Sequence, residues 1–378
     1  MKLHRTNWVN SRSADLQSRD NRKMPTRSLF QRLLLGALVL TSPMSATAQA
    51  IKPTMKELIA AAQSERVLTT HQSGRFGNPA LWQDVQAAMK AKYGIDVQLN
   101  GSPAAPSMGQ MLSVLIDDYR AGRKPARADI FNSGGEQLLQ LAQADVLEKI
   151  DWKKYMPDLT SEEITMGGAS LAVGLSPYAL VYNTKVVKDP PKSLEDMADS
   201  RFKGMVFVLP YVYGFVQLGV IKGTKPIYDL FQKMVCNGNI AGTFRTGQLG
   251  RVTSGEIPIA AFNGSIVDVE ELKAKKAAIE SSDLGGELRI GGMEYSGVPK
   301  NSRSPNLATL TTLYLLTPEG QEIYYKHTGN DSPHRKGSRL QKLVPKIDFI
   351  ETPEKVQANP EVYTKLYPNM VKLLERGC

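Results

Sequence analysis

Five short segments of this chain each contain glycine, and three of them add tyrosine, arginine or histidine, a composition suited to binding a small polar molecule. They are HQSGRF at 71–76, NSGG at 132–135, PYVYG at 210–214, FRTGQ at 244–248 and NGS at 263–265. Loops of this composition present backbone N–H groups, which bind anions where they stand at the start of a helix. Arginine adds planar, bidentate recognition of a carboxylate or phosphate. None of the five segments contains Asp or Glu, and a cationic ligand needs carboxylates to compensate its charge. We therefore expect an anionic or polar neutral ligand, with Glu294 as the one nearby acid we identify.

The residues expected to contact this ligand are polar side chains, together with one glycine backbone. They are His71, Ser73, Arg75, Ser133, Gly134, Tyr211, Tyr213, Arg245, Asn263 and Ser265, with Tyr295 added from a later extended segment. Each has an alternative interpretation: a solvent-exposed side chain for the arginines and core packing for the tyrosines. For His71 the favoured interpretation is a structural histidine, and a ligand contact is the alternative. Tyr211 and Tyr213 are two residues apart, so an extended segment would place both on one face.

Motifs for catalysis or for a resident metal are missing from the sequence. It contains no G-x-S-x-G, no Walker loop and no G-x-G-x-x-G, and no H-x-x-x-H pair. Two cysteines cannot form a four-cysteine zinc site. We therefore expect no enzyme activity, no cofactor and no metal. A secreted hydrolase with a dispersed triad is the alternative from another class, with His71, His327 or His334 as its base.

The elements that must position these segments alternate between strand and helix. The patterns predict strands at 66–70, 95–99, 128–131, 178–182, 205–209 and 257–262, and helices at 78–93, 108–121, 136–143, 215–219, 225–235 and 249–254. This order indicates α/β structure with parallel sheets covered by helices. Ligands of such sheets bind beyond the carboxyl ends of the strands. The chain has 378 residues, which at about 150 residues per domain predicts two domains.

The first fifty residues have the composition of a cleaved signal peptide. Basic residues precede an apolar run, Leu33–Leu40, and small residues end at Ala50. Eight apolar residues span about 12 Å as a helix, far less than a bilayer core of about 30 Å. Met24 would begin a signal peptide of ordinary length, and we expect residues 1–23 to precede the true start; an amphipathic surface helix is the alternative. Six units of the net charge of +10 lie in residues 1–50, which leaves +4 for the rest. We therefore expect a periplasmic protein with no nucleic-acid partner.

Five longer segments, in this order, resemble the class II periplasmic solute-binding proteins of ABC importers, in particular the ferric-iron and small-anion binders. They are VLTTHQSG, ADIFNSGGEQLLQLAQADVLEKID, LSPYALVYNTKVVKDPPKSLEDMADSRFKGMVFVLP, GEIPIAAFNGSIVDVEELKAK and TPEGQEIYYKHTGNDSP. The resemblance covers almost all of the chain after residue 50. It implies two lobes, each a mostly parallel sheet flanked by helices, joined by crossing hinge strands. The implied bounds are 51–175 and 292–330 for lobe 1 and 176–291 for lobe 2, with a C-terminal helical tail at 331–378.

The resemblance implies a function as well as a fold. It implies a monomeric substrate-binding component that captures a small ligand and delivers it to permease subunits of an ABC transporter in the inner membrane. The iron-binding members use two adjacent tyrosines in a late cleft loop, where this chain has Asn263-Gly264-Ser265. The pair of tyrosines is missing at this place. Ferric iron with a synergistic anion is therefore the alternative cargo rather than the favoured one. The adjacent pair Tyr324-Tyr325 falls on a predicted helix, where one buried and one exposed ring is the expected arrangement.

The cysteines of an exported chain are usually in an oxidising compartment, where disulfides form. Cys236 and Cys378 are far apart in the sequence, which does not determine their distance in space. Two free thiols and one disulfide are both compatible with the sequence. A disulfide would place the C-terminal tail on lobe 2.

Overall fold

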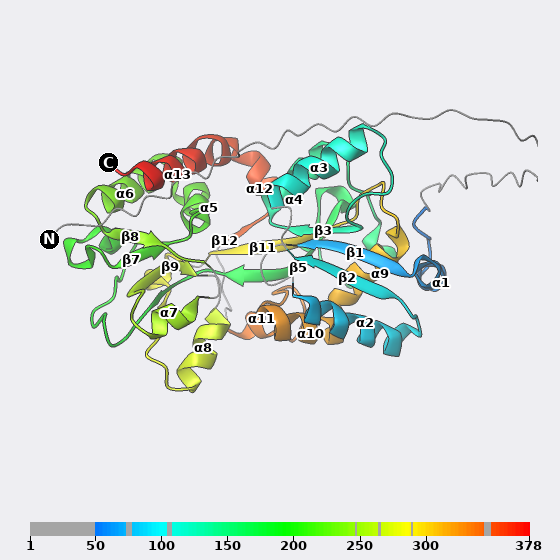
Figure 1. The fold of residues 1–378 in the computed structure, drawn as a ribbon, viewed down its shortest axis with the longest axis horizontal. Coiled ribbons are helices and arrows are strands. Elements are labelled where there is room, and N and C mark those ends of the chain that lie inside the picture. The colour runs from blue at the N-terminus through cyan, green and yellow to red at the C-terminus, as the bar shows by residue number, and fades with distance from the viewer. Residues whose placement is uncertain are drawn as a thin grey trace, which may run out of the picture. The chain divides into compact units, whose positions relative to one another are not determined.

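The computed structural model contains two mixed sheets flanked by helices (Figure 1). It describes residues 50–72, 78–103, 108–245, 248–263, 266–288, 290–343 and 349–378. The predicted signal peptide and the site residues Ser73, Arg75 and Ser265 lie outside the described residues. The expected α/β class, with two sheets in two lobes, is confirmed.

Lobe 1 is the larger sheet with its helices. Its strand order is β2-β1-β3-β11-β5-β4, and β12 pairs with β11. The strands are β1 (Val67–Gln72), β2 (Gln98–Pro103), β3 (Ile130–Ser133), β4 (Ile164–Thr165), β5 (Ser170–Pro177), β11 (Ile290–Gly297) and β12 (Phe349–Glu351). The helices are α1 (Met55–Glu65), α2 (Pro79–Tyr93), α3 (Met108–Arg120), α4 (Gly135–Gln143), α9 (Pro305–Leu315), α10 (Pro318–Thr328), α11 (Arg339–Leu343) and α12 (Pro353–Ala358), with 3-10 turns η2 (Trp152–Lys154) and η3 (Met166–Gly168).

Lobe 2 is the smaller sheet with its helices, in the strand order β10-β6-β9-β7-β8. The strands are β6 (Ala179–Tyr182), β7 (Val206–Val208), β8 (Ile240–Thr243), β9 (Ile259–Asn263) and β10 (Glu280–Ser282). The helices are α5 (Tyr213–Lys222), α6 (Thr224–Cys236), α7 (Leu249–Thr253), α8 (Ile266–Ala274) and α13 (Tyr367–Arg376), with 3-10 turns η4 (Glu195–Ala198), η5 (Ser200–Phe202) and η6 (Leu284–Gly286) and the π-helix η7 (Val362–Leu366).

Local sequence signals explain where the best-defined helix begins and ends. The side chain of Asn78 accepts a hydrogen bond from the backbone N–H of Ala80, and Pro79 occupies the first turn of α2. Both features favour a helix start. Gly94 ends α2 in the left-handed conformation with φ 70°, which glycine adopts without strain.

The chain passes between the two lobes along strands that run side by side. β5 of lobe 1 continues into β6 of lobe 2, and the return strand β11 pairs antiparallel with β5. Both sheets are therefore mixed rather than mostly parallel, since a strand that returns from the other lobe runs against its neighbour. β1, β2 and β3 remain parallel, so their carboxyl ends share one edge of lobe 1.

The C-terminal tail makes a third passage, from lobe 1 to lobe 2. β12 pairs with β11, and α12 contacts α4, whereas α13 contacts α6 of lobe 2. Figure 1 shows α12 beside α4 and α13 beside α6. Val362, Leu366 and Met370 of the tail belong to the buried core of lobe 2.

A disulfide joins the tail to lobe 2. It links Cys236, the last residue of α6, with Cys378, and their Cα atoms are 5.4 Å apart. Of the two arrangements that the sequence allowed, the disulfide is therefore the one present, and the end of the tail lies on lobe 2.

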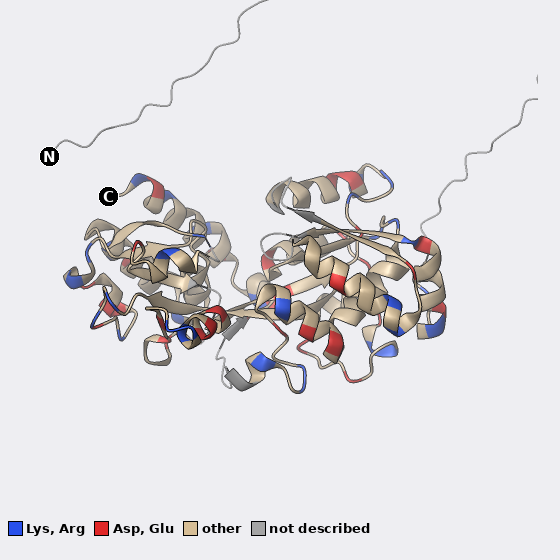
Figure 2. Cartoon of the chain, turned by 60° about the horizontal axis from the view of Figure 1, so that its bottom comes forward, with Lys and Arg blue, Asp and Glu red and all other residues tan. Residues whose placement is uncertain are grey.

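Charged residues of both signs are interspersed over the helices and loops of the described chain (Figure 2). Among the described residues, no helix is both long enough and apolar enough to cross a bilayer.

Candidate functional site

The start of α4 carries two of the predicted site residues. Ser133 ends β3, and its Oγ donates to Gln137 Oε1 at 3.0 Å. Gly134 is the N-cap of α4 and offers no side chain to its first turn. A Cβ added to Gly134 would lie 3.5 Å from Gln137 Oε1 and 4.0 Å from Glu351 Oε1. The side chains of Gln137 and Glu351 therefore approach the start of α4.

The start of α5 carries the two predicted tyrosines, and their rings are in contact. Val212 adopts a left-handed conformation with φ 41° immediately before α5 begins at Tyr213. The ring centroids of Tyr211 and Tyr213 are 5.1 Å apart. Tyr213 also stacks on Tyr367 of the tail at 6.0 Å, with an interplanar angle of 10°. The two tyrosines are thus adjacent, as expected, although a tight turn rather than an extended segment brings them together.

The two helix starts meet through hydrogen bonds between the lobes. Gln137 Nε2 of α4 donates to the Tyr213 hydroxyl at 3.1 Å. The Tyr213 hydroxyl donates in turn to Glu136 Oε2 at 3.4 Å. Glu136 is half-buried, and its burial raises the pKa of its carboxyl.

A second carboxyl, that of Glu351 in β12, lies at the same junction. Glu351 Oε2 accepts from the Tyr363 hydroxyl at 2.6 Å and from Gln217 Nε2 at 3.3 Å. Glu351 is only 5% exposed, and burial raises its pKa. We call Glu136, Gln137, Tyr213, Gln217, Glu351 and Tyr363 the junction cluster.

Tyr295 is a core residue at this junction. It is fully buried, and its hydroxyl donates to the backbone oxygen of Glu351 at 3.0 Å. Its ring lies in the apolar core around Phe131 and Leu138. The core-packing interpretation thus describes its position in this structure, and a ligand contact remains a prediction.

His71 lies at the end of β1, inside lobe 1. Its side chain is 1% exposed, and its ring stacks on Phe131 with centroids 6.1 Å apart. Among the described residues, neither ring nitrogen has a hydrogen-bond partner. Burial lowers the pKa of the ring, which favours neutral imidazole. The ring is therefore buried, as the structural interpretation expects, and its hydrogen-bond partner and a ligand contact remain predictions.

The remaining predicted residues of lobe 2 are less constrained. Arg245 is exposed, and its backbone N–H donates to Gln248 Oε1 at 3.0 Å. Asn263 ends β9, and its side chain lies outside the described part of the chain. Their roles in binding remain predictions.

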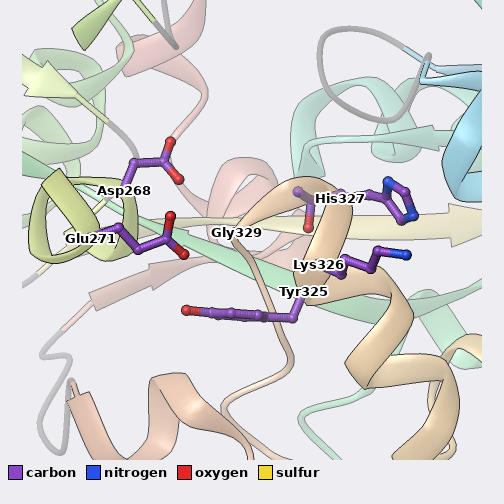
Figure 3. Close-up of a pocket in the computed structure, with 7 residues that line it drawn as sticks. Asp268, Glu271, Tyr325, Lys326, His327 and Gly329 are labelled. Atoms are coloured by element: carbon purple, nitrogen blue, oxygen red, sulfur yellow. The ribbon is translucent and has the colours of Figure 1, made fainter. Parts of the chain in front are cut away.

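A cavity of about 350 Å³ lies between α8 of lobe 2 and the end of α10 of lobe 1. It is lined by Asp268, Glu271, Tyr325, Lys326, His327, Thr328 and Gly329. Figure 3 shows the carboxylates of Asp268 and Glu271 on one side and the Tyr325 ring extending toward α8.

The basic groups of α10 point away from this cavity (Figure 3). Lys326 Nζ and His327 Nε2 contact Asp84 Oδ2 at 2.7 Å and 2.8 Å. The cavity walls therefore present mainly hydrogen-bond acceptors.

The adjacent tyrosines of α10 have different surroundings. Tyr324 is buried, and its hydroxyl donates to Glu294 Oε2 at 2.7 Å. Tyr325 is half-buried at the cavity. Tyr324 is the expected buried ring, whereas Tyr325 is half-buried rather than exposed, and Glu294 already has a partner.

The sequence-based count of charges missed the acids that reach this region from outside the five segments. Glu136 directly follows NSGG in the sequence. The other acids lie on elements that are distant in the sequence, and no sequence spacing indicates their position. They are Glu351 on β12 and Asp268 and Glu271 on α8. The expectation that Glu294 is the one nearby acid is therefore wrong.

Two α/β lobes, joined by side-by-side strands and meeting through polar groups at the strand ends, define a two-lobed binding-protein fold. The chain belongs to the bacterial extracellular solute-binding protein family, which it matches over residues 83–364. The resemblance seen in the sequence is thereby confirmed. No curated protein matches the chain in sequence.

Solved structures show the same fold at low sequence identity. Iron-bound HitA from Pseudomonas aeruginosa is 20% identical with a TM-score of 0.65, over 80% of this chain and 99% of that one. The periplasmic binding protein AfuA from Actinobacillus pleuropneumoniae, with fructose-6-phosphate bound, is 17% identical with a TM-score of 0.64, over 82% and 99%. A ferric binding protein from Campylobacter jejuni is 17% identical with a TM-score of 0.62, over 80% and 99%.

Proposed function

We propose that this chain is the periplasmic substrate-binding component of an ABC importer that captures a small anionic or polar metabolite between its lobes. The observation that carries the proposal is the contact between the starts of α4 and α5, where Gln137 and Glu136 of lobe 1 meet Tyr213 of lobe 2. A ligand that touches both lobes at such a junction favours the arrangement in which they are together. The closed form then docks on permease subunits in the inner membrane.

The described residues refine the expected ligand chemistry. The junction cluster and the cavity at α8 present carboxyl and phenol oxygens, which accept hydrogen bonds from hydroxyl or amino groups. We propose that Arg75 and Arg245 bind the anionic group of the cargo, since guanidinium recognises carboxylate and phosphate bidentately. A metabolite with one anionic group and several hydroxyls suits both sets. The fructose-6-phosphate bound by AfuA is a compound of this kind.

The remaining parts of the proposal follow from the family and the sequence. We propose that residues 1–50 direct export and are removed, and that the chain acts as a monomer without catalysis or cofactor. The lobe bounds of 51–175, 292–330 and 176–291 stay predictions.

The test begins with the ligand itself. Residues 51–378, produced by export, would be analysed by native mass spectrometry for a co-purified small molecule. A thermal-shift screen of sugar phosphates and organic acids would follow. A ligand at about 100 times its Kd stabilises the folded state by about 2.7 kcal/mol.

A matched pair of variants then tests the arginine. Arg75→Ala should weaken binding of the identified ligand at least tenfold, whereas Arg120→Ala, at an exposed position on α3, should leave Kd unchanged. An unchanged Kd for Arg75→Ala would remove Arg75 from the site. If no member of the screen binds and none co-purifies, the proposed ligand class is wrong.

Ferric iron held with a synergistic anion is the second candidate, because HitA and the Campylobacter protein are iron binders with this fold. Among the described residues, no group of three His, Cys, Asp or Glu could hold a metal ion. Elemental analysis of protein exported from iron-replete cells distinguishes the candidates. One iron per chain would replace the metabolite proposal.

A further inference from the structure

Three hydrogen bonds of the junction cluster run from donors on the lobe 2 side to carboxyl oxygens of lobe 1, and Gln137 of lobe 1 donates to the Tyr213 hydroxyl in the other direction. The acceptors, Glu136 of α4 and Glu351 of β12, lie on lobe 1. The donors Tyr213 and Gln217 lie on α5, and Tyr363 lies in the part of the tail that packs on lobe 2. The contact between the lobes thus holds one buried carboxyl, Glu351, and one half-buried carboxyl, Glu136, against neutral hydroxyl and amide donors.

The groups that surround the two carboxyls are phenols and further acids. Glu351 is affected by the charge of Glu136, so the two carboxyls are close enough to repel when both are ionised. The titratable and charged groups on the elements around them are Tyr178 beside β6, Tyr213 on α5, Tyr295 and Glu294 on β11, Tyr363 and Tyr367 on the tail, and Glu354 and Lys355 on α12.

No lysine, arginine or histidine in the described part of the chain is among the groups that shift the pKa of either carboxyl. For both groups burial is the main cause, and it raises the pKa. Two ionised carboxylates at this contact would therefore be partly or fully removed from water and mutually repelling, without a positive charge shown to compensate them.

We propose that Glu136 and Glu351 form a proton-binding site at the junction of the two lobes, which holds protons while the lobes are in contact and releases them when the lobes separate. Tyrosine and amide donors bind a carboxyl group in either protonation state. What changes with pH is therefore the cost of buried charge rather than the presence of the hydrogen bonds.

The sign of the pH dependence follows from the two states of the junction. In contact, burial raises the pKa of both carboxyls; when the lobes separate, water restores values near the ordinary 4.3 of glutamate. The state in contact therefore binds protons more tightly and is favoured as pH falls. Each proton taken up changes the contact equilibrium by a factor of about 10 per pH unit between the ordinary and the raised pKa.

Only the consequence for transport depends on the proposed function. If closure of the lobes captures cargo, capture is tighter at acid pH.

The experiment measures the distance between the lobes without any cargo. A donor and an acceptor dye would be attached through non-natural amino acids at the exposed positions Lys154 of lobe 1 and Lys233 of lobe 2, which leaves the disulfide intact. Energy transfer would be recorded from pH 5.0 to 8.0 for the exported chain. We expect transfer to change with pH in the wild type, toward the closer state at low pH, with a midpoint above 4.3.

Three variants assign the transition to the junction. Glu136→Gln/Glu351→Gln should hold the closer state across the whole range. Glu361→Gln, at an exposed glutamate, should reproduce the wild-type curve. Tyr213→Phe removes a donor without removing a titrating carboxyl, so it should shift the curve toward the separated state and retain the pH dependence.

The outcomes that overturn the proposal are equally specific. A wild-type distance that stays constant from pH 5.0 to 8.0 would overturn it, and so would an unchanged transition in the double glutamine variant. If circular dichroism shows that the double variant is unfolded, the single variants replace it, and each should lower the number of linked protons. Because no ligand is used, failure of the cargo screen leaves this result interpretable.

Discussion

Replacing both cysteines by serine should substantially lower the free energy of unfolding, because the disulfide closes a long loop. Cys236 and Cys378 are separated by 142 residues. In the chain-entropy model, a link over this separation restricts the unfolded chain by about 5 kcal/mol at 25 °C, and measured effects are typically about 2–4 kcal/mol. Both cysteines are exposed, so serine leaves no cavity and the loss reports the link itself. We expect the double serine variant to lose about 3–5 kcal/mol.

The assay is urea unfolding followed by circular dichroism and tryptophan fluorescence. The free energy of unfolding would be compared between oxidised wild type, reduced wild type and Cys236→Ser/Cys378→Ser. Reduced wild type and the double variant should agree, because both lack only the covalent link. The slope against urea should be steeper without the disulfide, since the unfolded chain then exposes more surface.

Two results would refute this reasoning. A loss below about 1 kcal/mol would show that the unfolded chain is not restricted as the chain-entropy model requires. A loss in the serine variant without an equal loss on reduction would trace the effect to the substitutions. Hydrogen exchange adds a spatial check, because α13 should lose protection before the strands of lobe 2.

Two further predictions concern packing and pH. A Cβ at Gly214 would overlap the ring of Phe262, whereas one at Gly250 meets nothing within 4 Å; Gly214→Ala should therefore lower the free energy of unfolding by about 1–3 kcal/mol, and Gly250→Ala should raise it by up to about 1 kcal/mol. Equal effects in thermal unfolding would contradict the packing argument. Burial lowers the pKa of His71 in the folded chain, so the unfolded chain binds the extra proton and stability falls as pH drops below about 6.5. His71→Gln should remove that part of the decline between pH 7.0 and 5.0 in urea titrations, and an unchanged decline would show that the ring titrates normally.

The parts of this fold that the sequence predicts are those with local causes. The start of α2 depends on Asn78 and Pro79, and its end depends on Gly94; all three residues belong to this helix or its caps. The NSGG segment likewise lies where a strand meets a helix, at Ser133 and Gly134. Backbone requirements of this kind restrict which residue types can occupy a position, so the sequence indicates them directly.

The parts that the sequence does not predict are contacts between distant residues. Gln217 donates to Glu351 across 134 residues of sequence, and neither neighbourhood contains a motif. The antiparallel pairing of β11 with β3 and β5 also depends on the path of the chain between lobes. The number of acids near the loops could not be predicted for the same reason. Glu136 is adjacent to a loop in the sequence, whereas Glu351 lies on β12, which is distant in the sequence.

The third passage of the chain has a consequence for biosynthesis. Lobe 2 begins its sheet at Ala179, but Val362, Leu366 and Met370 are needed to fill its core. A nascent chain that has emerged only as far as lobe 1's return strand therefore carries a second lobe with an open apolar face. The core of lobe 2 is therefore completed only after the final helix has been synthesised, and the disulfide then links the last segment of the chain to this lobe.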